Sequence, residues 1–100
     1  MSNLTSSQRS YLTKCSHRIK PVVYIGKEGL TESVGKATNE AFKFNEIVKV
    51  KFASNRELKR DISLELESFT DSSLVRIIGH IAIYYKPFEN KADRVLHLPK

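Results

Sequence analysis

The chain has 100 residues, of which 40% are hydrophobic and 28% charged, with a formal net charge of +6 and a pI of about 9.6. This length predicts one domain with a single core, and the positive charge favours a polyanionic partner such as nucleic acid. The single cysteine excludes an intramolecular disulfide, and with no bilayer-spanning apolar run and no secretion signal we expect a cytoplasmic protein.

The first third of the chain predicts a helix followed by a short strand. Thr5-Ser6-Ser7-Gln8 has capping-box spacing, which indicates a helix from there to about residue 17. Lys20-Pro21 then favours an extended backbone, and the apolar, β-branched run 22–25 predicts a buried strand. Residues 1–27 carry five basic and no acidic side chains, so this part of the chain is strongly cationic.

The predicted strand leads directly into Gly26-Lys27-Glu28-Gly29, and helical periodicity follows over about residues 30–44. Two glycines three apart let backbone N–H groups approach a partner closely, and a helix N-terminus behind them favours an anion. No dinucleotide fingerprint and no P-loop is present. Two interpretations remain: a turn that merely needs glycine, and a Gly-x-x-Gly loop that contacts a nucleic-acid backbone, as in KH-type modules. Gly35, inside the helix, predicts a close approach by another element.

The second half predicts three more strands. Residues 47–53 alternate, with Lys49 and Lys51 on the face opposite the apolar side chains, which indicates a half-buried strand with a basic open face. A helix with a clean apolar stripe follows over about 55–69, and strands 74–78 and 81–86 form an antiparallel hairpin. The predicted fold is therefore α/β, in the order α-β-α-β-α-β-β, with a mixed four-stranded sheet whose first three strands run parallel. The polar tail 89–100 adds an edge strand or remains loose.

Several basic residues are candidates for one binding surface. Lys20 and Lys27 lie near the glycine loop, and we expect Lys49, Lys51 and Lys86 to share the open face of the sheet. Tyr84 and Tyr85 point to opposite faces, so one belongs to the core and the other is available to stack on a base. A single lysine is usually just solvated, but their joint placement favours a binding surface.

The titratable residues give no sign of catalysis or metal binding. The three histidines are scattered and there is one cysteine, which predicts no metal site. No nucleophile–base pair and no catalytic carboxylate pair is visible in the spacing. We therefore predict a protein that is not an enzyme, with no cofactor and no small-molecule substrate.

One block of the chain resembles the signature of the CRM domain, a family named for RNA splicing and ribosome maturation. The block is His17-Arg18-Ile19-Lys20-Pro21 continued through Gly26-Lys27-Glu28-Gly29-Leu30-Thr31, and later pieces such as Ile77-Ile78-Gly79 and Tyr85-Lys86-Pro87 support it. The resemblance covers about residues 4–88, so the predicted domain is 1–88. A free-standing domain of this size is similar to the bacterial YhbY-type members, with a fold related to the C-terminal domain of initiation factor three.

The resemblance implies an RNA-binding protein associated with the large ribosomal subunit or its precursor, acting in ribosome assembly. It assigns backbone contact to Gly26, Lys27, Glu28 and Gly29, and a basic surface to Lys20, Lys49, Lys51 and Lys86. Two residues depart from the family pattern: Glu28 places an acid in the loop, and Lys86 stands where many members have arginine. We expect a monomer with ribosomal RNA in the pre-50S particle as partner and no membrane. The alternative is a protein-interaction module that docks on a ribosomal protein or an assembly GTPase.

Overall fold

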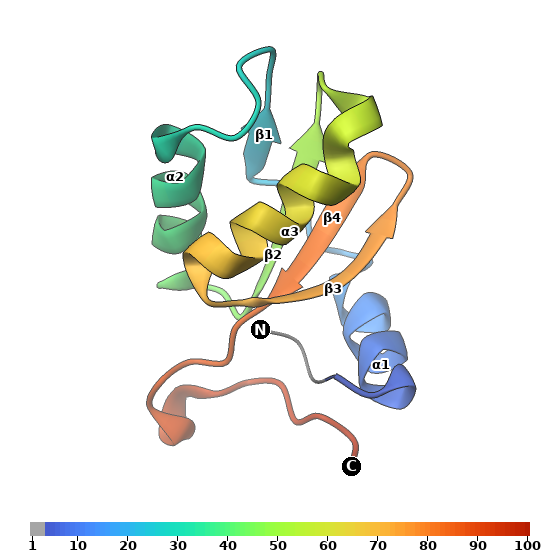
Figure 1. The fold of residues 1–100 in the computed structure, drawn as a ribbon. Helices are drawn as coiled ribbons and strands as arrows, with labels where there is room; N and C mark the ends of the chain where they lie inside the picture. Colours follow the sequence, from blue (N-terminus) through green and yellow to red (C-terminus); the bar gives the residue numbers. More distant parts are fainter. Residues whose placement is uncertain (1–3) are drawn as a thin grey trace.

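A computed structural model describes residues 4–100 and confirms the α/β class and the predicted order of helices and strands (Figure 1). Residues 1–3 of the predicted 1–88 domain lie outside the described residues. The elements are α1 (Ser6–Ser16), β1 (Val23–Ile25), α2 (Glu32–Phe42), β2 (Ile47–Phe52), the short 3-10 turn η1 (Arg56–Leu58), α3 (Lys59–Thr70), β3 (Ser73–Ile78), β4 (Ile81–Tyr85) and the 3-10 turn η2 (Lys91–Asp93).

The four strands form one mixed sheet in the order β1-β2-β4-β3. β1 pairs in parallel with β2, while β4 lies between β2 and β3 and pairs antiparallel with both. The first three strands therefore run in one direction, and β3 and β4 form an antiparallel hairpin, as predicted. Because the hairpin inserts β4 next to β2, the two outer strands of the sheet are β1 and β3.

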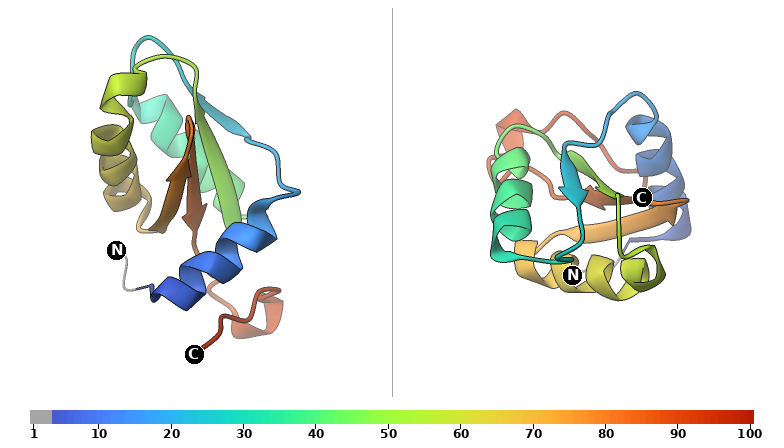
Figure 2. Two further views of the ribbon diagram at one scale, coloured as in Figure 1. Left: turned by 90° about the vertical axis from the view of Figure 1, so that its right-hand side faces the viewer. Right: turned by 90° about the horizontal axis from the view of Figure 1, so that it is seen from above.

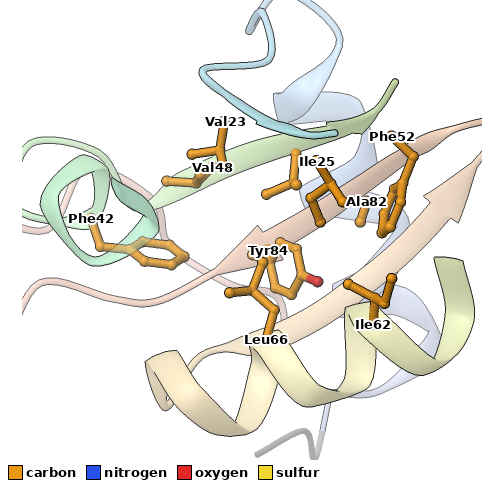
Figure 3. Close-up of a cluster of buried hydrophobic side chains, with 10 residues drawn as sticks. Val23, Ile25, Phe42, Val48, Phe52, Ile62, Leu66, Ala82 and Tyr84 are labelled. Carbon is orange, nitrogen blue, oxygen red and sulfur yellow. The ribbon is translucent and has the colours of Figure 1, made fainter. Parts of the chain in front are cut away.

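Helices α2 and α3 cover one face of the sheet and enclose the larger core (Figure 3). Tyr84 lies within it, and its hydroxyl donates a hydrogen bond to the Ser63 carbonyl at 2.8 Å. Burial raises the pKa of Tyr84 above its ordinary value. Between the helices, a Cβ on Gly35 would lie 2.2 Å from Cε1 of Phe69, which confirms the close approach predicted at this glycine.

Helix α1 packs against the opposite face of the sheet, at the end of the molecule remote from the β1–α2 loop (Figure 2). Its N-terminus has the predicted capping box. The backbone N–H of Gln8 donates to Thr5 Oγ1 at 3.1 Å, and the backbone N–H of Thr5 donates to the side-chain Oε1 of Gln8 at 3.0 Å. The Arg9 guanidinium donates to the carbonyls of Leu74 and Val75 at 2.7 and 2.6 Å. These carbonyls lie at the β-bulge of β3, so Arg9 ties α1 to that edge.

The tail, residues 89–100, forms no edge strand. It crosses below the sheet in Figure 1 and places Leu96 and Leu98 against the core that α1 covers. A buried carboxylate holds it: Glu46 accepts hydrogen bonds from the amides of Phe88 at 3.1 Å, Val95 at 2.9 Å and Leu96 at 3.1 Å. The N–H groups of Val95 and Leu96 are thus satisfied by a side chain, where a strand would have used a neighbouring backbone.

Candidate nucleic-acid interface

The glycine loop, residues 26–29, is a turn whose shape the protein itself fixes. The Gly29 amide donates to the Gly26 carbonyl at 3.0 Å, and Gly29 has a φ of +71°, in the left-handed region. From the β2–α3 connection, Asn55 Nδ2 donates to the carbonyls of Gly26 at 2.8 Å and Lys27 at 3.1 Å. The loop therefore needs no partner to order it, and a partner would meet it preformed.

Glycine stands at the two positions of the loop for different structural reasons. Gly29 needs its left-handed φ, which a side chain tolerates poorly. Gly26 has no such φ, and a Cβ built on it would meet no atom within 4 Å. The turn alone therefore does not require glycine at position 26. What its missing side chain provides is bare backbone at the exposed surface, where another backbone can come close.

The start of α2 offers less positive charge to an anion than the sequence suggested. Thr31 caps the helix, since its Oγ1 accepts from the Val34 amide at 3.2 Å. Glu32 lies in the first turn and pairs with Lys36 at 2.9 Å, and exposed Glu28 adds an acid to the loop itself. These groups already complement the positive end of the helix, so attraction for phosphate has to come from the surrounding bases.

Two further loops lie beside the glycine loop and bring cations with them. The Phe52 amide donates to the His80 carbonyl at 2.8 Å, and the Lys59 ammonium donates to the Gly79 carbonyl, so the β3–β4 turn packs against the β2–α3 connection. Slight desolvation and the positive charges of Arg56, Lys59 and Lys51 lower the pKa of the exposed His80 below its ordinary value. We call residues 26–29, 53–58 and 79–80 together the loop end; Figure 2 shows these connections at one end of the molecule.

Lys51 and Lys49 extend this cationic surface along the sheet. Lys51 is exposed and lies opposite Tyr24 of β1, and Lys49 is half-buried two residues earlier on the same face. Lys27 is exposed on the glycine loop, and Lys20 is exposed just before β1. The structure thus places Lys27 at the loop end and Lys49 and Lys51 on the open face leading to it, with Lys20 where β1 begins.

Lys86 does not belong to this surface, which corrects the predicted placement. It follows β4 at the opposite end of the sheet, and its ammonium donates to the Thr70 carbonyl at the end of α3, at 2.9 Å. Because side chains alternate along a strand, Lys86 faces the helices α2 and α3, away from the face of Lys49 and Lys51.

The aromatic prediction also needs correction, because Tyr84 and Tyr85 are both buried. Tyr84 belongs to the core under α2 and α3, and Tyr85 to the core under α1. Burial, with Glu46 nearby, raises the pKa of Tyr85. The exposed tyrosine is Tyr24, with 57% of its surface accessible. The run 22–25, predicted as buried, has only its alternate residues Val23 and Ile25 buried.

Metal binding and membrane spanning find no support in the described part of the chain. Within residues 4–100, no three His, Cys, Asp or Glu side chains gather in a way that could hold a metal ion. Across the same residues, every helix is too short or too polar to cross a membrane.

Comparison with known proteins assigns the chain to a family. Residues 4–86 match the model of the CRS1 / YhbY (CRM) domain. The chain belongs to the CRM domain family. The match confirms the resemblance drawn from the block around the glycine loop, and it ends at residue 86, just before the tail.

Two curated relatives of this CRM domain match it over nearly their whole length. A Haemophilus influenzae protein named RNA-binding protein is 37% identical and covers 100% of this chain and 99% of its own. Probable RNA-binding protein YqeI of Bacillus subtilis is 32% identical, with coverage of 96% and 99%. Both are named for RNA binding and neither as an enzyme, which agrees with the prediction of a protein without catalytic activity.

A solved structure shows the same fold. The solution structure of a hypothetical Staphylococcus aureus protein, proposed there to bind RNA, superposes with a TM-score of 0.80 at 32% sequence identity. The superposition covers 96% of this chain and 99% of the other. The mixed sheet with three helices is therefore the CRM fold.

Proposed function

We propose that this CRM domain binds RNA, with the glycine loop against the sugar-phosphate backbone and the surrounding cations on phosphates. The observation that carries the proposal is Gly26, whose missing side chain the turn does not require and whose backbone faces open space. The cationic groups around it, and the names of its relatives, support RNA as the partner.

The arrangement favours recognition of backbone and shape. Four basic side chains lie at or beside the loop end, against two exposed acids, Glu28 and Glu57. The bases neutralise phosphates without reading base sequence. Glu28 would repel a phosphate placed directly on the loop. The glycine loop therefore positions the RNA, while Lys27, Lys51, Arg56 and Lys59 contribute most of the affinity.

Ribosomal RNA of the large subunit or its pre-50S precursor is the target that we infer, with the protein acting as a cytoplasmic monomer in ribosome assembly. This finer assignment rests on the resemblance to the YhbY-type members. The compact binding surface at one end of a small domain agrees with a factor that docks on a preformed RNA particle.

The test measures binding of ribosomal RNA at two salt concentrations for the wild type and for Lys27→Glu/Lys51→Glu. The double variant should lose on the order of 100-fold in affinity, and its plot of log affinity against log salt should be shallower by about two units. Crosslinking in cells, with mapping of the RNA sites, then identifies the ribosomal element.

A matched control separates local charge from total charge. Lys91→Glu/Lys100→Glu changes the net charge by the same amount on exposed residues of the tail. This control should bind nearly as the wild type does. Equal affinity of all three proteins would refute the assignment of Lys27 and Lys51 to the RNA interface. An equal loss of affinity in both variants would mean that only the total charge of the protein matters for binding.

Protein docking is the second candidate, and an apolar patch favours it. Phe44 and Val95 are 79% and 73% exposed, and they line a shallow groove together with Ile19 and Phe88, far from the loop end. The partner in this second proposal is a ribosomal protein or an assembly GTPase. A pull-down that survives RNase treatment and is lost in Phe44→Ser would support this function.

A further inference from the structure

One row of side chains crosses the whole sheet next to the loop end and is not covered by α1. The pairing register places Tyr24 opposite Lys51, Lys51 opposite Ile81, and Ile81 opposite Ile78. All four lie on the same face of the sheet as α1. The helix covers this face only at the end remote from the glycine loop, where Leu12 packs on Ile47, Ile83 and Tyr85. We call these four residues the open row.

Tyr24 is the aromatic member of this row. It lies in the middle of β1, and its hydroxyl makes only a long contact of 3.4 Å with the carbonyl of Pro21, which precedes the strand. With 57% of its surface accessible, its ring offers an exposed apolar face to a partner.

The neighbours of Tyr24 define the chemistry of that partner. None of the four strands contains an aspartate or glutamate, while β2 contributes Lys49 and Lys51 and β3 contributes Arg76. The open row therefore joins an aromatic ring and two aliphatic side chains with an exposed ammonium between them. A group with a flat apolar ring and an adjacent negative charge complements this pattern, and an unpaired nucleotide is such a group.

We propose that the open row binds an unpaired nucleotide, whose base stacks on Tyr24 and whose phosphate lies at Lys51. The proposal rests on the proposed RNA-binding function and narrows it. The bases of an intact A-form duplex are stacked on one another and are not free to stack on a side chain, so the preferred RNA has a loop, bulge or single-stranded end at this position.

A tryptophan reporter tests the stacking directly. The chain contains no tryptophan, so Tyr24→Trp introduces a single fluorophore at the site. An unstructured single-stranded RNA should quench its emission on binding, because a stacked base quenches indole fluorescence. A blunt duplex of equal length should bind through the cations and leave the emission nearly unchanged.

Substitution of Tyr24 measures how much the stacked ring contributes to RNA affinity. Tyr24→Leu keeps an apolar side chain but removes the ring, and it should weaken binding of the single strand about 5- to 150-fold, as expected for one base stacked on an aromatic. Binding of the duplex should change less than about twofold. Tyr24→Phe, which keeps the ring, should bind both RNAs as the wild type does. Phe69→Leu makes the same aromatic-to-leucine change at an exposed site on α3, on the other side of the sheet, and is the matched control.

The outcomes separate this inference from the function on which it rests. If the wild type binds neither RNA, the proposed function fails. If the wild type binds RNA but Tyr24→Leu binds the single strand equally well, or loses both RNAs equally, the open row is not a nucleotide site and the RNA-binding function stands. Circular dichroism of each variant establishes that it is folded.

Discussion

The two ends of the molecule use their basic side chains differently. At the loop end Lys27 is exposed, and exposed Lys51 lies beside it on β2. Arg56 and Lys59 lie near His80 and donate to the carbonyls of Phe52 and Gly79, but Arg56 remains exposed. At the other end, which we call the tail end (α1, Glu46 and residues 86–100), three basic groups bind the protein's own carbonyls. These pairs are Arg9 with Leu74 and Val75, Lys86 with Thr70, and Arg94 with Phe88. A net charge of +6 therefore overstates how many cations act on a partner.

The acidic residues show the same division. Glu46 at the tail end is buried and accepts three backbone hydrogen bonds, so it is part of the fold. Glu28 at the loop end is exposed and weakens the attraction for phosphate. We therefore expect substitutions at the tail end to change stability and leave RNA binding intact. Substitutions at the loop end should weaken RNA binding and leave stability intact.

The largest effect is expected for Glu46→Ala. Three amides lose their acceptor, so the free energy of unfolding should fall by about 3 kcal/mol, with part of the loss relieved when the tail opens to water. Urea denaturation measures the loss, and Glu46→Gln, which keeps an acceptor oxygen, should lose less. RNA affinity at a temperature where the variant is folded should equal that of the wild type. A parallel loss of affinity would break the division between the ends.

Gly26→Val tests the loop end. The backbone at this position accepts a side chain and the space is empty, so stability should change by less than about 0.5 kcal/mol. RNA affinity should fall at least about tenfold, because the isopropyl group keeps the RNA backbone away from the loop. Titration with ribosomal RNA measures this, with Ala92→Val at the exposed tail as control. Unchanged affinity would mean that the glycine serves only the turn.

Lys86→Met is expected to act at the tail end only. Loss of its hydrogen bond to the Thr70 carbonyl should lower the free energy of unfolding by about 1 kcal/mol. RNA affinity and its salt dependence should stay within about twofold of the wild type. A salt slope reduced by about one unit would instead return Lys86 to the RNA-binding surface.

The smallest expected effect is the contribution of His80 to the pH dependence of RNA affinity. Its pKa is lowered in the folded protein, so as pH falls through 6.5 the unfolded chain takes up the proton first and His80 disfavours the folded state. Bound phosphate offsets the neighbouring cations and favours the protonated ring. RNA affinity should therefore rise more on acidification for the wild type than for His80→Gln, by less than about fivefold at so exposed a site. Identical pH profiles would place His80 outside the interface.

Local patterns in the sequence predicted most of the fold. The capping box at Thr5 and the alternation through Lys49 and Lys51 are set by neighbouring residues, so they could be identified from spacing alone. The position of β4 between β2 and β3 could not, because a hairpin can join a sheet through either of its strands. That position determines which side chains meet across the sheet, including the open row.

The candidate site was predicted only in part for the same reason. Lys27, Lys49 and Lys51 follow from the glycine loop and from alternation. The roles of Arg9, Glu46 and Lys86 depend on partners at least 16 residues away, so spacing could not show that they serve the fold. Arg56 and Lys59 were missed as site residues because their proximity to His80 arises only when the β3–β4 turn packs beside the start of α3.

The hydrogen bond from Gln8 Nε2 to the Pro99 carbonyl, at 2.9 Å, joins the two terminal segments of the described chain at the tail end. A surface-attachment tag, a fluorescent label or a second module joined at the C-terminus would therefore start from the side opposite the glycine loop (Figure 1). This geometry suits the domain to tandem fusions, in which each copy presents its loop to a separate stretch of one polymer.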